Sequence, residues 1–236
     1  MIVISVAGLN IGIDNKYDFI KNLASDYTVS SDRIDFTVSC DEADLAAEAE
    51  MSEGEYPLGY LESIAVYRKI AERLPEYGAF VFHGAVLAVG GNAYAFTARS
   101  GVGKTTHIGL WLKEFGSEVH ILNGDKPIIR MIDGIPYACG TPWRGKENFG
   151  VPEMLPLKAV SFIGRAAENS AREISVGDAL MRFVSQIYVP RSEKTAPLAL
   201  MTVNRVISSV GLFELFVNMD ASAAHVARDA ITADAN

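Results

Sequence analysis

The residues best suited to chemistry lie in a glycine-rich segment near the middle of the 236-residue chain. Residues 98–106 read Ala-Arg-Ser-Gly-Val-Gly-Lys-Thr-Thr, after an apolar run and before an amphipathic one. A strand, a glycine-rich loop and a helix in this order are the context of a phosphate-binding loop, whose backbone N–H groups turn inward around a polyphosphate. We therefore predict a nucleotide site made by Ser100, Gly101, Val102, Gly103, Lys104, Thr105 and Thr106.

The side chains near this segment predict a magnesium-dependent site. Lys104 is expected to pair with the β and γ phosphates, and the Thr105 hydroxyl to bind Mg²⁺, which prefers oxygen ligands. Asp125 follows the next apolar run and is predicted to hold the metal directly or through water. Because Asn-Gly-Asp is also a common turn sequence, a structural role for Asp125 stays open. The motif departs from its usual form at Ala98, where the first glycine is expected.

A second group of charged residues lies in the segment 141–150. Arg144 and Lys146 could neutralise charge on a transferred phosphoryl group, and the Glu147 carboxylate could reach the metal. A solvated turn of mixed charge is the alternative for all three. Trp143 could stack on a base, although packing is the commoner role of a tryptophan beside a proline in a turn.

The composition restricts the classes of function. Apolar residues make up 49% of the chain, which predicts a globular core. A net charge of −8 argues against a surface that follows nucleic-acid phosphates, so any anion must be captured locally. Two cysteines are too few for a disulfide framework or a four-cysteine zinc site. With no apolar run of the ~18 residues that a membrane span needs, and no basic leader, we expect a cytoplasmic protein that binds neither nucleic acid nor membrane.

The first third of the chain shows no chemical motif. Residues 2–6 and 34–38 predict short strands, and the acidic stretch 41–55 predicts a mobile loop. Apolar residues at helical spacing predict a helix that ends at Pro75: Tyr60, Ile64, Tyr67, Ala71 and Leu74. We expect residues 1–78 to pack on a main domain of residues 79–236.

The remaining elements predict a mixed α/β fold around a sheet. Gly90-Gly91 and Asp133-Gly134 are hairpin signals, each between two apolar runs. A helix is predicted from the phosphate loop to Gly116, a strand at 118–122, and a functional loop at 140–158. After a strand at 159–163 come two helices, a strand at 212–218 and a closing helix capped by Asp220.

Several of these motifs together resemble the HPr serine kinase/phosphorylase family and, more distantly, the phosphoenolpyruvate carboxykinases. The resemblance covers about residues 80–230 and is carried by His83-Gly84, Ser-Gly-Val-Gly-Lys-Thr-Thr, Asp125 and Gly140-Thr141-Pro142-Trp143. It implies an HPr kinase/phosphoenolpyruvate carboxykinase-like P-loop nucleotide-binding fold, phosphoryl transfer from ATP or pyrophosphate to a serine hydroxyl, and self-association. It also implies that His83 lies near the phosphates and that Arg191 approaches the transferred group.

One departure from the family concerns catalysis. The family has two adjacent acids where this chain has Gly124-Asp125, so that Asp125 is left with the metal or with the attacking hydroxyl. The leading hypothesis is a Mg²⁺-dependent kinase with catalytic residues Asp125, Lys104, His83, Arg144 and Arg191 and metal ligands Thr105, Asp125 and Glu147. The acceptor is a protein, a peptide or a small hydroxylated molecule. The alternative is a nucleotide-binding regulatory protein without turnover.

Overall fold

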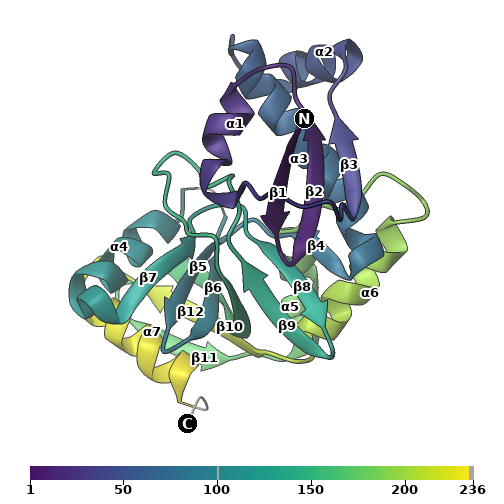
Figure 1. Ribbon diagram of the computed structural model, residues 1–236. Helices are drawn as coiled ribbons and strands as arrows, with labels where there is room; N and C mark the ends of the chain where they lie inside the picture. The colour runs from purple at the N-terminus through teal and green to yellow at the C-terminus, as the bar shows by residue number, and fades with distance from the viewer. Residues whose placement is uncertain (100, 234–236) are drawn as a thin grey trace.

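The computed structural model describes residues 1–99 and 101–233. Within these residues the strands form two sheets, one of three strands and one of nine, and helices pack against both (Figure 1). The mixed α/β class predicted from the sequence is therefore confirmed. No helix of the described residues is long and apolar enough to cross a bilayer.

The large sheet is mixed and is organised around one long strand, β10. Its path runs β4-β8-β9-β10-β6-β5-β7, while β12 pairs with both β10 and β11. The strands are β4 Ala79–Val81, β5 Ala85–Val89, β6 Asn92–Thr97, β7 Val119–Asn123, β8 Ile128–Ile132, β9 Ile135–Cys139, β10 Met154–Arg165, β11 Ser170–Glu173 and β12 Gly211–Val217. Both predicted hairpins are confirmed, since β5 pairs with β6 and β8 with β9, each antiparallel. β6 and β10 are parallel, so their carboxyl ends lie at the same edge.

Helices cover both faces of this sheet. Successive side chains of β6 point to opposite faces and are buried on both, so each face needs a covering layer. Tyr94 and Phe96 face one cluster, with α4 (Lys104–Phe115) and α7 (Ser222–Thr232), whereas Ala93 and Ala95 face the other. The second cluster contains α5 (Val176–Val184) and α6 (Ala196–Ile207). Figure 1 shows α4 and α7 together at one side of the sheet and α6 at the opposite side.

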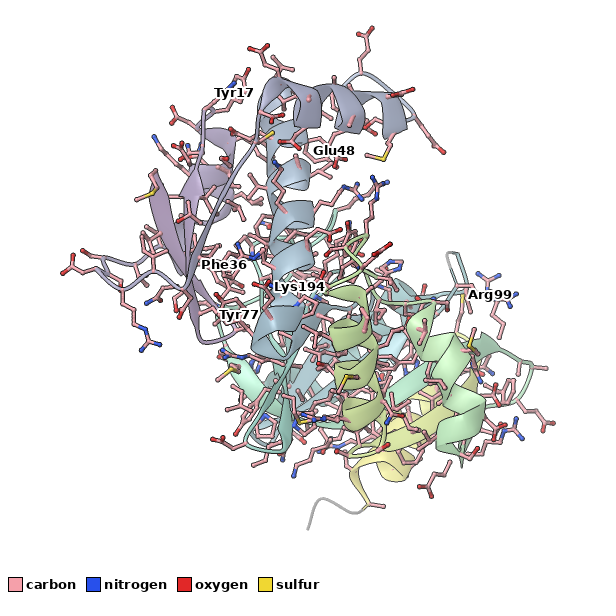
Figure 2. All side chains as sticks on the ribbon, turned by 90° about the vertical axis from the view of Figure 1, so that its right-hand side faces the viewer. Tyr17, Phe36, Glu48, Tyr77, Arg99 and Lys194 are labelled. Atoms are coloured by element: carbon pink, nitrogen blue, oxygen red, sulfur yellow. The ribbon has the colours of Figure 1, made fainter. Side chains whose placement is uncertain are left out.

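Residues 1–78 form the smaller sheet and three α-helices. The sheet contains β1 Ile2–Val6, β2 Leu9–Asp14 and β3 Phe36–Ser39; the helical segments are α1 Phe19–Leu23, η1 Ser25–Tyr27, α2 Glu42–Met51, α3 Leu58–Arg73 and η2 Leu74–Tyr77. β2 was not foreseen as a separate strand; Ala7 and Gly8, both with positive φ, turn the chain from β1 into it. In Figure 2, α3 stands upright beside this sheet, with Tyr77 at its lower end.

The N-terminal segment shares a hydrophobic cluster with the large sheet, and a few polar contacts fix its orientation. Trp143 stacks on Tyr67 of α3 with ring centroids 4.0 Å apart, and its indole N–H donates to Ser63 O at 3.0 Å. The Tyr67 hydroxyl donates to Lys126 O at 2.7 Å. Arg130 of β8 donates to Ala7 O at 2.7 Å. Helix α3 therefore contacts directly the two segments that follow β7 and β9.

The prediction of a mobile loop at 41–55 is wrong, because most of that stretch is α2. Asp41 and Asp44 form a reciprocal capping box at its start. Its acidic charge is matched by α3, where Arg68 binds Glu48 with two hydrogen bonds and Lys69 binds Asp44. The sequence itself carries the helix signal, because Ala, Leu and Glu, all strong helix formers, follow the capping box.

Two further boundaries differ from the prediction. β10 begins at Met154, inside the predicted loop, because its first residues pair with β9 before the strand shifts register and joins β6. Asp220 does not cap α7: its carboxylate accepts from the Asn218 amide at 3.0 Å, and the N-cap residue is Ala221. β11 was not predicted; it pairs only with β12.

Replacing Gly140 by alanine should destabilise the protein. A methyl group there would overlap the backbone oxygen of Val151 and lie 2.9 Å from Leu122 O. Neither backbone atom can yield without moving β7 or the segment that precedes β10, so we expect a loss of about 3 kcal/mol or more in the free energy of unfolding, measured by urea denaturation. Gly109→Ala is the matched control: it meets open space within α4 and should stabilise by up to ~1 kcal/mol. An unchanged stability of the Gly140 variant would contradict the tight contact.

Candidate functional site

The glycine-rich loop joins β6 to α4, and its glycines take backbone angles that L side chains rarely adopt. Gly101 has φ +77° and Gly103 has φ +118°, and α4 begins at the next residue, Lys104. Among the described residues, no side chain caps this helix and no acid lies in its first turn. The N-terminus of α4 is thus left to attract an anion. Ser100 lies outside the described residues.

Arg165, at the end of β10, holds the loop from outside. Its guanidinium donates to Val102 O at 2.8 Å and to Gly101 O at 2.6 Å. Binding these two carbonyl oxygens restricts the orientation of the peptide groups between Gly101 and Gly103. Sequence reasoning missed Arg165, because nothing near it in the chain indicates that β10 lies beside β6.

Lys104 reaches from the start of α4 to the end of β7. Its ammonium donates to Gly124 O at 3.2 Å and lies 4.0 Å from Asp125 Oδ1. Only 17% of the side chain is exposed, and burial lowers its pKa, although the Asp125 and Glu147 carboxylates oppose part of this shift. The structure therefore brings Lys104 and Asp125 together and places the charge of Glu147 near them.

The turn that carries Asp125 is held by Asn123, whose side chain is fully buried. Its Oδ1 accepts from the backbone N–H groups of Asp125 and Lys126 at 2.9 and 2.8 Å. Its Nδ2 donates to Thr141 Oγ1 at 3.0 Å and to the carbonyl oxygen of Thr141 at 3.2 Å. The turn character of Asn-Gly-Asp was visible in the sequence; the supporting role of Asn123 was not.

Three cationic or titratable groups surround the Asp125 carboxylate. Besides Lys104, His83 Nε2 lies 3.6 Å from Oδ1 and Lys126 Nζ lies 3.9 Å from Oδ2. Burial lowers the pKa of His83 below its usual 6.5, the Asp125 charge raises it, and the two lysines lower it further. The net shift favours the neutral imidazole at pH 7. His83 thus lies beside Asp125 and Lys104, whereas Lys126 was not foreseen as part of the cluster.

The segment 141–150 packs directly on Gly124-Asp125. A methyl group at Gly145 would come within 2.8 Å of Asp125 Cβ, and one at Gly124 would come within 3.2 Å of Arg144 O. Gly124 also donates its backbone N–H to Phe149 O at 3.0 Å. A second acid at position 124 would therefore have to displace the backbone of this segment.

Arg144 is bound by the N-terminal part of the chain, and its predicted contact with a phosphoryl group stays a prediction. Its guanidinium donates to Asp26 at 2.7 Å and lies 5.4 Å from the centre of the Tyr27 ring, both in η1. This short segment offers both a carboxylate and an aromatic face, which together hold the cation. Trp143 packs on Tyr67, as the commoner of its two predicted roles requires.

Arg191 is attached to α3 through its backbone, and its predicted approach to the transferred group stays a prediction. Its backbone N–H donates to Glu72 of α3, which also accepts from the Tyr188 hydroxyl at 2.7 Å. The Arg191 side chain is exposed, and no hydrogen bond or ion pair of the described residues joins it to Lys104, Asp125 or His83. The segment before α6 is thus fastened to α3 and not to the phosphate loop.

His107 anchors α4 beneath the loop. It is 2% exposed, and its Nε2 accepts from the Trp111 indole N–H at 3.0 Å. Its Nδ1 has no hydrogen-bond partner among the described residues. Burial lowers its pKa to about 4, so the imidazole is neutral in the folded protein. These contacts fit a packing role.

Stability should fall as the pH drops from about 6.5 towards 4, because the unfolded state then binds a proton at His107 that the folded state excludes. The contribution of this residue between pH 7 and 5 is about 2 kcal/mol. His107→Gln keeps an acceptor for Trp111 but cannot titrate, so its free energy of unfolding should depend less on pH. His225→Gln, at an exposed position on α7, is the control. Equal pH dependence of His107→Gln and the unaltered protein would contradict this account.

Comparisons with known proteins give a distant likeness. No protein-family model matches the sequence, and no curated protein matches it. Among solved structures, the chain is similar to the Hpr(Ser) kinase/phosphatase from Coxiella burnetii, with a TM-score of 0.39 and 8% sequence identity over 66% of this chain and 99% of that one.

Proposed function

We propose that this protein binds a nucleoside triphosphate with Mg²⁺ through a P-loop and transfers its terminal phosphoryl group to a hydroxyl. The observation that carries the proposal is the position of Lys104, whose ammonium lies between the open N-terminus of α4 and the Gly124-Asp125 turn. A lysine there pairs with the terminal phosphates while the backbone N–H groups of residues 101–105 bind the others.

Thr105 and Asp125 are the proposed protein ligands of the metal. Both offer oxygen atoms, which Mg²⁺ prefers, and Thr105 is exposed at the start of α4. No three His, Cys, Asp or Glu side chains of the described residues converge on one point, so phosphate and water oxygens complete the proposed shell, with Glu147 nearby. The bound metal would neutralise charge on the transferred group.

The protein's own part in catalysis is positioning and charge neutralisation. Lys104 holds the terminal phosphate, and the neutral imidazole of His83, beside Asp125, can accept a hydrogen bond from the attacking hydroxyl. With Arg144 bound to Asp26, further positive charge near Asp125 comes from Lys126. The acceptor is proposed to be a serine of a protein or peptide, or a small hydroxylated molecule.

A second candidate function is nucleotide-dependent regulation without turnover. Gly124 favours it, because position 124 lacks the second acid and a Cβ there would lie only 3.2 Å from the backbone oxygen of Arg144. A protein of this kind would bind the triphosphate and change the position of segment 141–150, which already lies on Asp125. Formation of ADP from ATP, assayed with hydroxylated acceptors as well as with water, separates the two candidates.

Lys104→Ala should abolish nucleotide binding. Calorimetric titration with ATP and Mg²⁺ should show a loss of at least about 100-fold in affinity, which corresponds to about 2.7 kcal/mol. Lys113→Ala, an exposed lysine on the same helix, is the matched control and should bind like the unaltered protein. Unchanged ATP affinity in a folded Lys104 variant would refute the proposed phosphate site.

Asp125→Asn should separate binding from turnover. The amide keeps the shape of the side chain but loses the charge that holds Mg²⁺, so we expect phosphate release from ATP to fall by about 100-fold or more. Phosphate release is measured with water as the acceptor. ATP binding without any formation of ADP by the unaltered protein, with water or with hydroxylated acceptors, would favour the regulatory candidate, whereas release that survives Asp125→Asn would exclude Asp125 as the metal ligand.

A further inference from the structure

A cavity of about 660 Å³ lies beside the phosphate loop, and Asp125 is not among its lining residues. Its walls come from the loop, from the carboxyl ends of β6 and β10, and from the last turns of α5. Representative lining residues are Ala98, Val102, Phe162, Gly164, Met181 and Ser185. The volume falls within the range of about 300–1,000 Å³ that is usual for small-molecule sites. The carboxyl ends of parallel strands are the usual place for such a ligand in α/β sheets.

The order of strands decides which part of a bound nucleotide reaches this cavity. β6 has β5 and then β7 on one side, and β10 on the other. Lys104 and Asp125 meet at the end of β7, so a terminal phosphate bound by Lys104 lies on that side. The cavity takes its walls from the β10 side. The rest of a polyphosphate ligand must leave the loop in the other direction, towards the cavity.

The lining chemistry suits a nucleoside. Ile163 and Met181 supply apolar surface for a base, and Arg99 supplies positive charge. Arg165 and Arg182 also line the cavity, the first bound to the loop carbonyls and the second paired with Glu214 at 2.9 Å. None of the described residues that line the cavity carries a carboxylate, although the chain as a whole is acidic. Figure 2 shows Arg99 at the outer end of the loop. A flat apolar base attached to an anionic phosphate chain matches this combination.

We infer that this cavity binds the base and ribose of a nucleoside triphosphate, so that the phosphoryl donor is a nucleotide and not pyrophosphate. The inference rests on the proposed function, because it needs the phosphates to occupy the loop. An acceptor is a poorer match for the cavity, since its hydroxyl must reach the terminal phosphate beside Asp125. Contacts between the base and the cavity would thus distinguish a nucleotide donor from pyrophosphate.

Ser185→Trp tests the inference by filling the cavity. Ser185 is the C-cap residue of α5 and lines the cavity, whereas Ser208 is the C-cap residue of α6, is exposed and is not among the lining residues, so Ser208→Trp is the matched control. Each protein is titrated calorimetrically with ATP and with inorganic tripolyphosphate, both with Mg²⁺. We expect Ser185→Trp to weaken ATP binding by about 10-fold or more and to change tripolyphosphate binding by less than about 2-fold.

Met181→Ala is a second variant, chosen because its side chain is 73% exposed and the fold does not depend on it. It removes apolar wall and should weaken ATP binding by several-fold, again without affecting tripolyphosphate. Equal affinity of the unaltered protein for ATP and tripolyphosphate, or unchanged ATP affinity in both cavity variants, would overturn the inference and leave the loop as a phosphate site. Failure of the unaltered protein to bind either ligand would instead overturn the proposed function.

Discussion

The hydrogen bonds of the buried Asn123 amide hold together the segments from which the site is built. Its oxygen fixes the turn that carries Asp125, and its nitrogen binds Thr141 at the start of the segment that covers that turn. Burying an amide destabilises the fold little when all its hydrogen bonds are made. If one partner were lost, an unpaired polar group would remain in the interior and lower the free energy of unfolding. Asn123 therefore accounts for the closeness of Asp125 and segment 141–150, and Lys104 joins them by donating to Gly124 O in the same turn.

The site concentrates positive charge within an acidic protein. Lys104 and Lys126 lie beside one carboxylate, and the guanidinium of Arg165 binds the loop carbonyls. With a net charge of −8, the molecule as a whole does not attract anions, so capture depends on these few groups and on the N-terminus of α4. This arrangement suits a small polyphosphate with its metal better than an extended polyanion.

Residues 1–78 take part in the architecture of the site, although they contribute no residue to the charged cluster. Arg144 binds Asp26, Trp143 stacks on Tyr67, and the Tyr67 hydroxyl binds Lys126 O. The segment that lies on Asp125 is consequently held at its start by η1 and α3. The boundary between residues 78 and 79 separates two parts of the sequence that share one hydrophobic cluster.

The sequence by itself determined the local structure. Glycines at positive φ indicate where the chain turns, so the hairpins at Gly90-Gly91 and Asp133-Gly134 and the strand, loop and helix around Lys104 could be predicted. Alternating and helical periodicity identified most of the elements of the large sheet and its covering helices.

The tertiary structure alone decided that Arg144 binds Asp26, that Arg165 binds the loop and that a cavity lies beside β10. Arg144 and Asp26 are 118 positions apart, and Arg165 and Gly101 are 64 apart. The direction of such side chains depends on which strands become neighbours, and no residue near them in the chain carries that information.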